Sequence, residues 1–168
     1  MISNNINTKE RGFTIVELLV VIVVIGILAA ITIVSYVGIT ARANTTKALS
    51  NAQSAQNVAE IFNADNGYYP ATAAAFATGS TSAKLPTAIT VVPEWGGTGA
   101  AFDAGTVPFT SSDGGTKVGY SCLAASTACA NATGGRITFW DFSTSARSTT
   151  IIYLGAATAS SVFFKPAS

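Results

Sequence analysis

Gly12-Phe13-Thr14-Ile15-Val16-Glu17 opens the stretch that decides how this chain folds, and an apolar run follows it directly. From Leu18 to Ile31 no side chain is charged or able to form a hydrogen bond, and apolar residues dominate as far as Ile39. A helix over 13–39 would be about 40 Å long, against about 30 Å for the hydrocarbon core of a bilayer. The run therefore predicts a helix that spans a membrane or lies inside an assembly of apolar helices.

Glu17 is the residue that contradicts this apolar pattern, because it lies about one turn inside the expected helix. A carboxylate in the middle of a bilayer costs about 3 kcal/mol, and somewhat less near the interface. Two interpretations stay open. Glu17 marks the edge of the span and reaches water, or it waits for a cation that an assembly supplies.

Arg11-Gly12-Phe13, the glutamate at position 17 and the long apolar run together resemble the amino-terminal signature of type IV pilins and pseudopilins. The resemblance implies that a prepilin peptidase removes the leader, residues 1–12, by cutting between Gly12 and Phe13. It implies that the same enzyme methylates the new amino terminus at Phe13. It also implies that Glu17 pairs with the terminal amine of a neighbouring copy of the chain.

Gly26 lies in the middle of the apolar run and is also expected to take part in assembly. With Ala30 it forms a pair of small residues four apart, which permits close approach of neighbouring helices. Many pilins have a proline eight residues after this glycine, and this chain has Val34 there.

The length of 168 residues fits one anchored domain. The apolar stretch is longer than the 7–15 residues typical of a secretory signal. Lys9 and Arg11 in the leader favour a cytoplasmic start, with the bulk of the chain outside. A net charge of +1 and a charged fraction of 10% argue against a nucleic-acid binder, which needs clustered Lys and Arg.

The helix is expected to continue beyond the span, because residues 40–64 contain no proline or glycine. Small residues recur there at alternating steps of four and three, which places them on one helical stripe. Gly67 and Pro70 are expected to stop the helix. The members of the stripe are Ala41, Thr45, Ala48, Ala52, Ala55, Ala59 and Phe62.

The rest of the head domain, 40–168, is expected to hold a connecting segment at 71–116 and a sheet within 117–168. Runs rich in β-branched and aromatic residues predict strands at 117–123, 136–142 and 149–154, with a fourth at 161–165 or 88–92. A long helix whose second half covers an antiparallel sheet of three or four strands is an α+β fold. The pilin resemblance implies the same fold.

Cys122 and Cys129 are expected to form a disulfide, because an exported domain meets oxidising conditions. A pair of free thiols is the alternative, and two ligands are too few for a zinc site. Some pseudopilins hold calcium, and the aspartates available here are Asp103, Asp113 and Asp141. The triplets that begin at Asn44 and Asn131 match the glycosylation acceptor pattern and are interpreted as structural.

No catalytic constellation is visible, and no cofactor is expected. The chain lacks histidine, so Ser-His and Cys-His nucleophile pairs cannot be built. The leading interpretation is a structural subunit of a type IV pilus that serves adhesion, motility or surface interaction. It would sit in the inner membrane as a precursor, among lipid and the pilus assembly machinery, before it joins an extracellular filament.

Two other interpretations remain. A pseudopilin of a type II secretion or DNA-uptake system would share the signature and form a short periplasmic fibre. A membrane-anchored enzyme or binding module would carry an anchor that only resembles that of a pilin.

Overall fold

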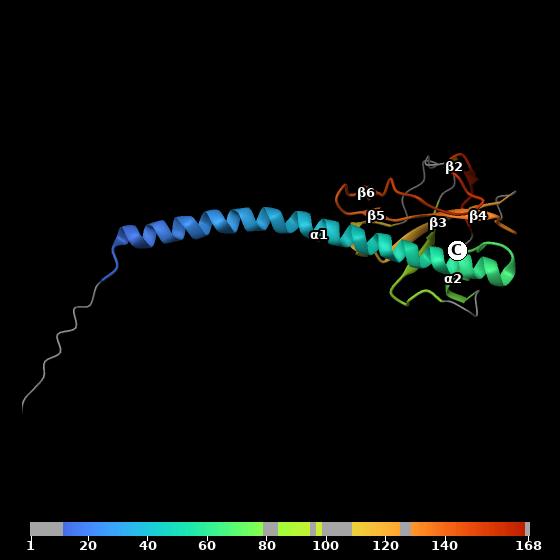
Figure 1. The fold of residues 1–168 in the computed structure, drawn as a ribbon, viewed down its shortest axis with the longest axis horizontal. Helices are drawn as coiled ribbons and strands as arrows, with labels where there is room; N and C mark the ends of the chain where they lie inside the picture. The colour runs from blue at the N-terminus through green and yellow to red at the C-terminus, as the bar shows by residue number, and fades with distance from the viewer. Residues whose placement is uncertain (1–11, 79–83, 95–96, 99–108, 125–128, 167–168) are drawn as a thin grey trace, which may run out of the picture. The chain divides into compact units, whose positions relative to one another are not determined.

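The computed structural model describes residues 12–78, 84–94, 97–98, 109–124 and 129–166. The chain divides into two compact units, residues 1–39 and 40–168. Helix α1, Ile15–Asn66, contributes residues to both units (Figure 1). It contains the apolar run and the stripe of small residues, as the sequence predicts.

The remaining elements are short, and all of them belong to the second unit. Helix α2 and the first two strands fall in the expected connecting segment. In chain order the elements are α2 (Ala75–Thr78), β1 (Thr90–Pro93), β2 (Gly97–Thr98), a 3₁₀ turn (Ser111–Asp113), β3 (Lys117–Leu123), β4 (Gly134–Thr138), β5 (Trp140–Asp141), β6 (Ala146–Arg147), β7 (Ile152–Gly155) and β8 (Val162–Phe163).

Four strands form the main sheet, in the order β1-β3-β4-β7. β3 pairs antiparallel with β4, and β4 pairs antiparallel with β7, which confirms the predicted meander. β1 runs parallel to β3, with Thr90 opposite Lys117, so the sheet is mixed rather than wholly antiparallel. A parallel neighbour needs a connection of about a dozen residues or more, and the chain between Pro93 and Lys117 is long enough.

Two of the predicted strands have different limits in the structure from those that the sequence predicts. The strand expected at 136–142 is divided into β4 and β5, and the strand expected at 149–154 begins only at Ile152. Asp141 explains the division, because its Oδ1 accepts hydrogen bonds from the backbone N–H and the hydroxyl of Ser143, at 2.9 and 2.6 Å. This local turn directs the chain into β6, which pairs with β5 outside the main sheet.

Each of the two segments that were alternatives for a fourth strand contains a strand in the structure. Residues 88–92 overlap β1, which lies at the edge of the main sheet. Residues 161–165 overlap β8, which pairs antiparallel with β2 in a separate small sheet.

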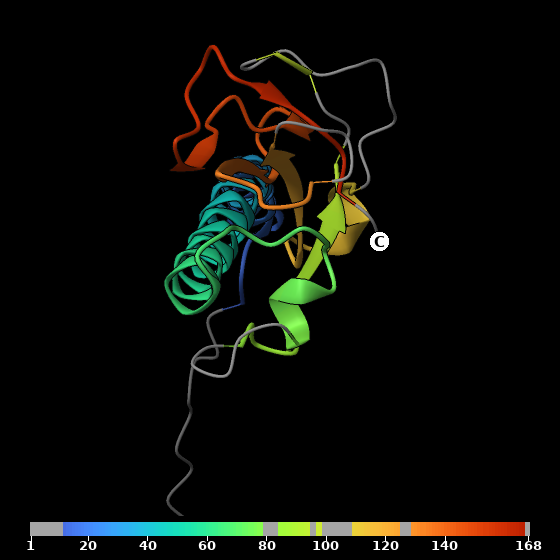
Figure 2. The same ribbon diagram turned by 90° about the vertical axis from the view of Figure 1, so that its right-hand side faces the viewer.

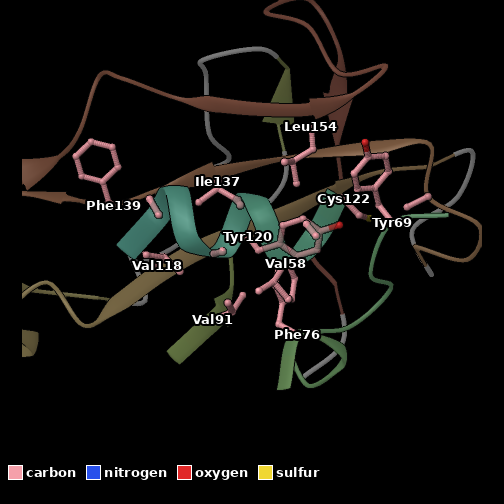
Figure 3. Packing of buried hydrophobic residues seen from close by; sticks show 14 of the residues in the cluster. Val58, Tyr69, Phe76, Val91, Val118, Tyr120, Cys122, Ile137, Phe139 and Leu154 are labelled. Atoms are coloured by element: carbon pink, nitrogen blue, oxygen red, sulfur yellow. The ribbon is translucent and has the colours of Figure 1, made fainter. Parts of the chain in front are cut away.

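Helix α1 lies beside the strands of the main sheet (Figure 2). Its small residues belong to the cluster of buried side chains that also includes Val118, Ile137 and Leu154 of the sheet. Ala48, Ala52, Ala55 and Ala59 are fully buried. A Cβ added to Gly115 would lie 3.1 Å from the Cβ of Ala48, which shows how closely the chain approaches the helix there. In Figure 3 the side chains that cluster with this part of α1 come from separate strands, from helix α2 and from the segment after α1. They include Tyr69, Phe76, Val91, Val118, Tyr120, Ile137 and Leu154.

Helix α1 ends where Gly67 adopts a left-handed conformation with φ of 79°. The Gly67 N–H donates to the Asn63 carbonyl at 2.8 Å, and the rings of Phe62 and Tyr68 meet edge to face at 5.7 Å. Two residues later, Tyr69 contacts the segment before β4, because its N–H donates to the Ala132 carbonyl at 2.8 Å. The helix end is therefore attached to the loop before β4.

The Tyr69 hydroxyl returns to α1 and donates to a carboxylate oxygen of Glu60 at 2.6 Å. Burial, together with this carboxylate, raises the pKa of Tyr69 to about 12. The tyrosine therefore stays neutral and remains a donor throughout the physiological pH range.

The second face of the sheet carries a buried polar layer. Glu94 and Arg136 are fully buried, and Arg147 is close to them, with its Nε 2.6 Å from a carboxylate oxygen of Glu94. Thr138 donates to the other oxygen of Glu94. The guanidinium of Arg136 lies over the ring of Phe163, 4.6 Å from its centroid. These contacts therefore connect Glu94, the residue after β1, with β4 and β6, and they connect β4 with β8.

The β5–β6 hairpin is attached to α1 as well. Thr45 donates its hydroxyl to Asp141 at 3.0 Å and accepts the backbone N–H of Phe142 at 3.0 Å. With the Glu94–Arg147 contact on its other side, the hairpin links the helix to the polar layer.

We predict that Ala52→Leu destabilises the head by about 1–3 kcal/mol, because the larger side chain does not fit between α1 and the sheet. The neighbouring exposed position provides the control, since Gln53→Leu should change stability little. Urea unfolding of the detergent-solubilised chain measures both. Equal stability of the two variants would contradict the packing described above.

Arg147→Met is expected to cost about 3 kcal/mol at neutral pH, because it leaves the Glu94 carboxylate buried without its closest cation. The double variant Glu94→Gln/Arg147→Met should lose less. Unfolding experiments on both variants provide this comparison, and a double variant no more stable than the single one would refute the pairing.

The pH dependence of the single variant gives a second test. Burial raises the pKa of Glu94, against the opposing effects of Thr138 and Arg147. A carboxyl group with a raised pKa in the folded state binds its proton more tightly when folded, so acid favours folding. The deficit of Arg147→Met relative to the parent should therefore shrink as the pH falls toward the ordinary value of 4.5.

Candidate assembly site at the start of helix α1

The first turn of α1 is closed by reciprocal hydrogen bonds between Thr14 and Glu17. A carboxylate oxygen of Glu17, Oε2, accepts the Thr14 backbone N–H at 2.8 Å and the Thr14 hydroxyl at 2.7 Å. The Glu17 N–H in turn donates to the Thr14 hydroxyl oxygen at 3.2 Å. This arrangement is a capping box, which satisfies backbone donors that a helix start otherwise leaves free.

Glu17 is the only charged residue between Gly12 and Thr40, and it is exposed. Within the described residues no cation forms an ion pair with it. Both bonds from Thr14 end on Oε2, so the other carboxylate oxygen can accept a further donor. Phe13, whose amine would be released by cleavage, is 86% exposed beside this turn.

The helix that follows exposes apolar side chains on all sides. Leu18 to Ile31 are exposed throughout, and the most apolar 18-residue window of α1 has a mean hydropathy of 3.1 with none of it buried. Its length and composition are sufficient to cross a membrane. A helix that is apolar all round needs lipid or other helices around it. Gly26 has no atom within 4 Å of an added Cβ, so its surface is open to a neighbour.

The cysteines lie in the head and far from this turn in sequence. Cys122 and Cys129 form a disulfide, and both residues are buried. Cys122, in β3, also exchanges backbone hydrogen bonds with Phe164, at 3.0 and 2.9 Å. The disulfide therefore fixes Cys129 to the strand that also pairs with Phe164.

The aspartates considered for calcium do not come together in the part of the chain that is described. Asp113 pairs with Lys117 at 2.9 Å, and this contact lowers the pKa of Asp113. Asp141 is held by Ser143 and Thr45. Asp103 lies outside the described residues, as do Lys9 and Arg11.

Comparison with known proteins agrees with this geometry. Residues 7–33 match the family model described as the prokaryotic N-terminal methylation motif. The amino-terminal part of this chain therefore carries the N-terminal methylation motif. The matched range includes Gly12 and Phe13, the capped Glu17 and most of the apolar run.

Relatives fall into two groups. Type II secretion system core protein G of Escherichia coli (strain K12) is 39% identical over 64 residues, which is 38% of this chain and 44% of that protein. Type IV major pilin protein PilE of Neisseria gonorrhoeae is 36% identical over 64 residues, 38% of each chain.

A fimbrial protein of Neisseria meningitidis serogroup B (strain ATCC BAA-335 / MC58) is 37% identical over 76 residues, 44% of this chain and 45% of that protein. The chain thus matches less than half the length of each of these relatives. No solved structure matches it significantly.

The role of Thr14 was not predicted from the sequence. The spacing Thr-x-x-Glu before an apolar run is itself the signature of a capping box, so the signal was present in the sequence. The pairing of Glu94 with Arg147 had no such signal, because these residues are distant along the chain and meet only in the fold.

We predict that Thr14→Val frays the first turn of α1, because the loss of a cap costs about 0.5–2 kcal/mol. Hydrogen exchange in detergent should be faster at the amides of residues 15–18, while Thr14→Ser should retain the parental rates. Parental rates in the valine variant would show that the capping box does not form.

Proposed function

We propose that this chain is the structural subunit of a type IV pilus, held in the inner membrane by the first part of α1 until it joins a filament. The observation that carries the proposal is the capped but unpaired Glu17 at the start of an exposed apolar helix. The methylation motif and the pilin relatives support it.

The proposed assembly begins with cleavage between Gly12 and Phe13, which creates a positively charged amine close to Glu17 in sequence. Methylation of that amine by the prepilin peptidase leaves it able to carry charge. In a low-dielectric setting an amine and a carboxylate attract strongly, whereas either of them alone has a desolvation cost. Pairing of Glu17 in one copy with Phe13 of its neighbour would relieve that cost and fix the axial step between subunits.

The apolar residues after Glu17 then surround one another in the filament core instead of contacting lipid. Gly26 would allow close contact between helices, because it presents no side chain. The head, with its disulfide and its alanine-faced helix, would form the outer layer. No catalytic role is assigned to it.

A pseudopilin is the second candidate, and the type II secretion relative favours it. Both candidates predict the same cleavage and the same pairing. They differ in the product, because a pilus extends from the cell surface and a pseudopilin fibre stays in the periplasm. Electron microscopy of cells labelled with an antibody against the head distinguishes the two.

The pairing itself is tested by Glu17→Ala. Loss of an ion pair worth about 3 kcal/mol in low dielectric should reduce subunit addition by about a hundredfold. Membrane insertion and leader cleavage should persist, as measured by fractionation and by the mass of the mature chain. Val20→Ala, one turn further along α1, is the matched control and should assemble.

Filaments of normal number and length from Glu17→Ala would refute the pairing role. An uncleaved chain that begins at Met1 would instead refute the assignment to this family of filament subunits.

A further inference from the structure

Asn66 and Gly67 form the only Asn-Gly pair in the sequence. This pair is chemically labile in peptides, because glycine does not hinder attack by its own backbone nitrogen on the preceding side chain. Here it lies at the exposed end of α1, where Gly67 stops the helix. The filament chemistry proposed above makes no use of it.

We propose that Asn66 is a conditional deamidation site, protected while the last turn of α1 is closed and reactive when that turn opens. In the reaction the Gly67 nitrogen gives up its proton to solvent and bonds to Cγ of Asn66. The Cγ–Nδ2 bond breaks, and the amide nitrogen leaves as ammonia. Water then opens the resulting succinimide ring to give aspartate or isoaspartate, with no oxidation or reduction.

The native geometry opposes the first step at both reacting groups. The Gly67 N–H is engaged, since it donates to the Asn63 carbonyl at 2.8 Å. The side-chain amide of Asn66 is turned back along the helix, where Nδ2 donates to the Phe62 carbonyl at 2.9 Å. Ring closure requires both hydrogen bonds to break, so the rate should follow the population of the opened turn.

The turn is held closed by contacts on either side of the pair. The edge-to-face contact between Phe62 and Tyr68 spans Asn66 and Gly67. Beyond it, Tyr69 is fixed by its hydrogen bonds to Ala132 and Glu60. These contacts distinguish the site from an unrestrained chain end.

The product would weaken the structure that had protected it. A carboxylate at position 66 loses the donor to Phe62 and joins Asp65 at the negative end of the helix dipole, where the last turn contains no basic residue. Isoaspartate would also lengthen the backbone immediately before Tyr68 and Tyr69. Each conversion would therefore favour further opening of the helix end.

The test incubates the full chain in detergent at mildly alkaline pH and follows the conversion at Asn66 by peptide mass spectrometry. Conversion should be about tenfold slower in the folded chain than in the denatured chain. In the denatured chain Asn66 should react before any other asparagine. Equal rates in the two states, or faster reaction at another asparagine, would overturn the proposal.

Tyr68→Ala removes the aromatic contact and should raise the folded-state rate several-fold. Tyr153→Ala, which removes a different ring contact, with Phe163, is the matched control and should leave that rate unchanged. A parental rate in Tyr68→Ala would overturn the role of the turn.

If either variant fails to fold, the parent chain in urea below its unfolding transition provides the same test. Conversion should accelerate before the sheet unfolds. A rate that rises only with global unfolding would contradict local opening. Because this readout does not depend on filaments, it is independent of the proposed function.

Discussion

A carboxylate at the start of an apolar helix is the constraint on which the rest of this structure depends. Glu17 has Thr14 as its hydrogen-bonding partner, and both bonds end on the same oxygen. The capping box stabilises the helix start but does not neutralise the charge. An ionised group that stays in hydrocarbon without a cation is strongly disfavoured. In the proposed assembly, the amine of Phe13 in a second copy would supply the cation that Glu17 lacks.

The head satisfies its own polar groups to a much greater extent. Alanine side chains bring α1 close to one face of the sheet. The opposite face buries Glu94 and Arg136, and the half-buried Arg147 contacts Glu94 there. The β5–β6 hairpin joins these two regions through Thr45 and Asp141. In the proposed assembly, such a unit would keep its shape while the apolar part of α1 exchanges lipid for protein neighbours.

Local and periodic signals predicted much of this fold. The alanine spacing identified the buried stripe, and Gly67 marked the end of the helix. Strand limits were predicted less well, because the turn at Asp141 depends on a side chain that competes with the sheet for the backbone. The parallel pairing of β1 was not anticipated, since it depends on a connection whose path the sequence pattern does not specify. The capping box could have been predicted from the spacing of Thr14 and Glu17. The Glu94–Arg147 pair could not, because these residues meet only in the tertiary structure.

The most direct measurement of the central claim is a cryo-EM reconstruction of the assembled fibre that resolves side chains in its core. The account predicts that the amine of Phe13 in one subunit lies within about 4 Å of the Glu17 carboxylate of a neighbour, along the whole fibre. A fibre core in which Glu17 contacts only Thr14 or solvent, with every amine elsewhere, would contradict it.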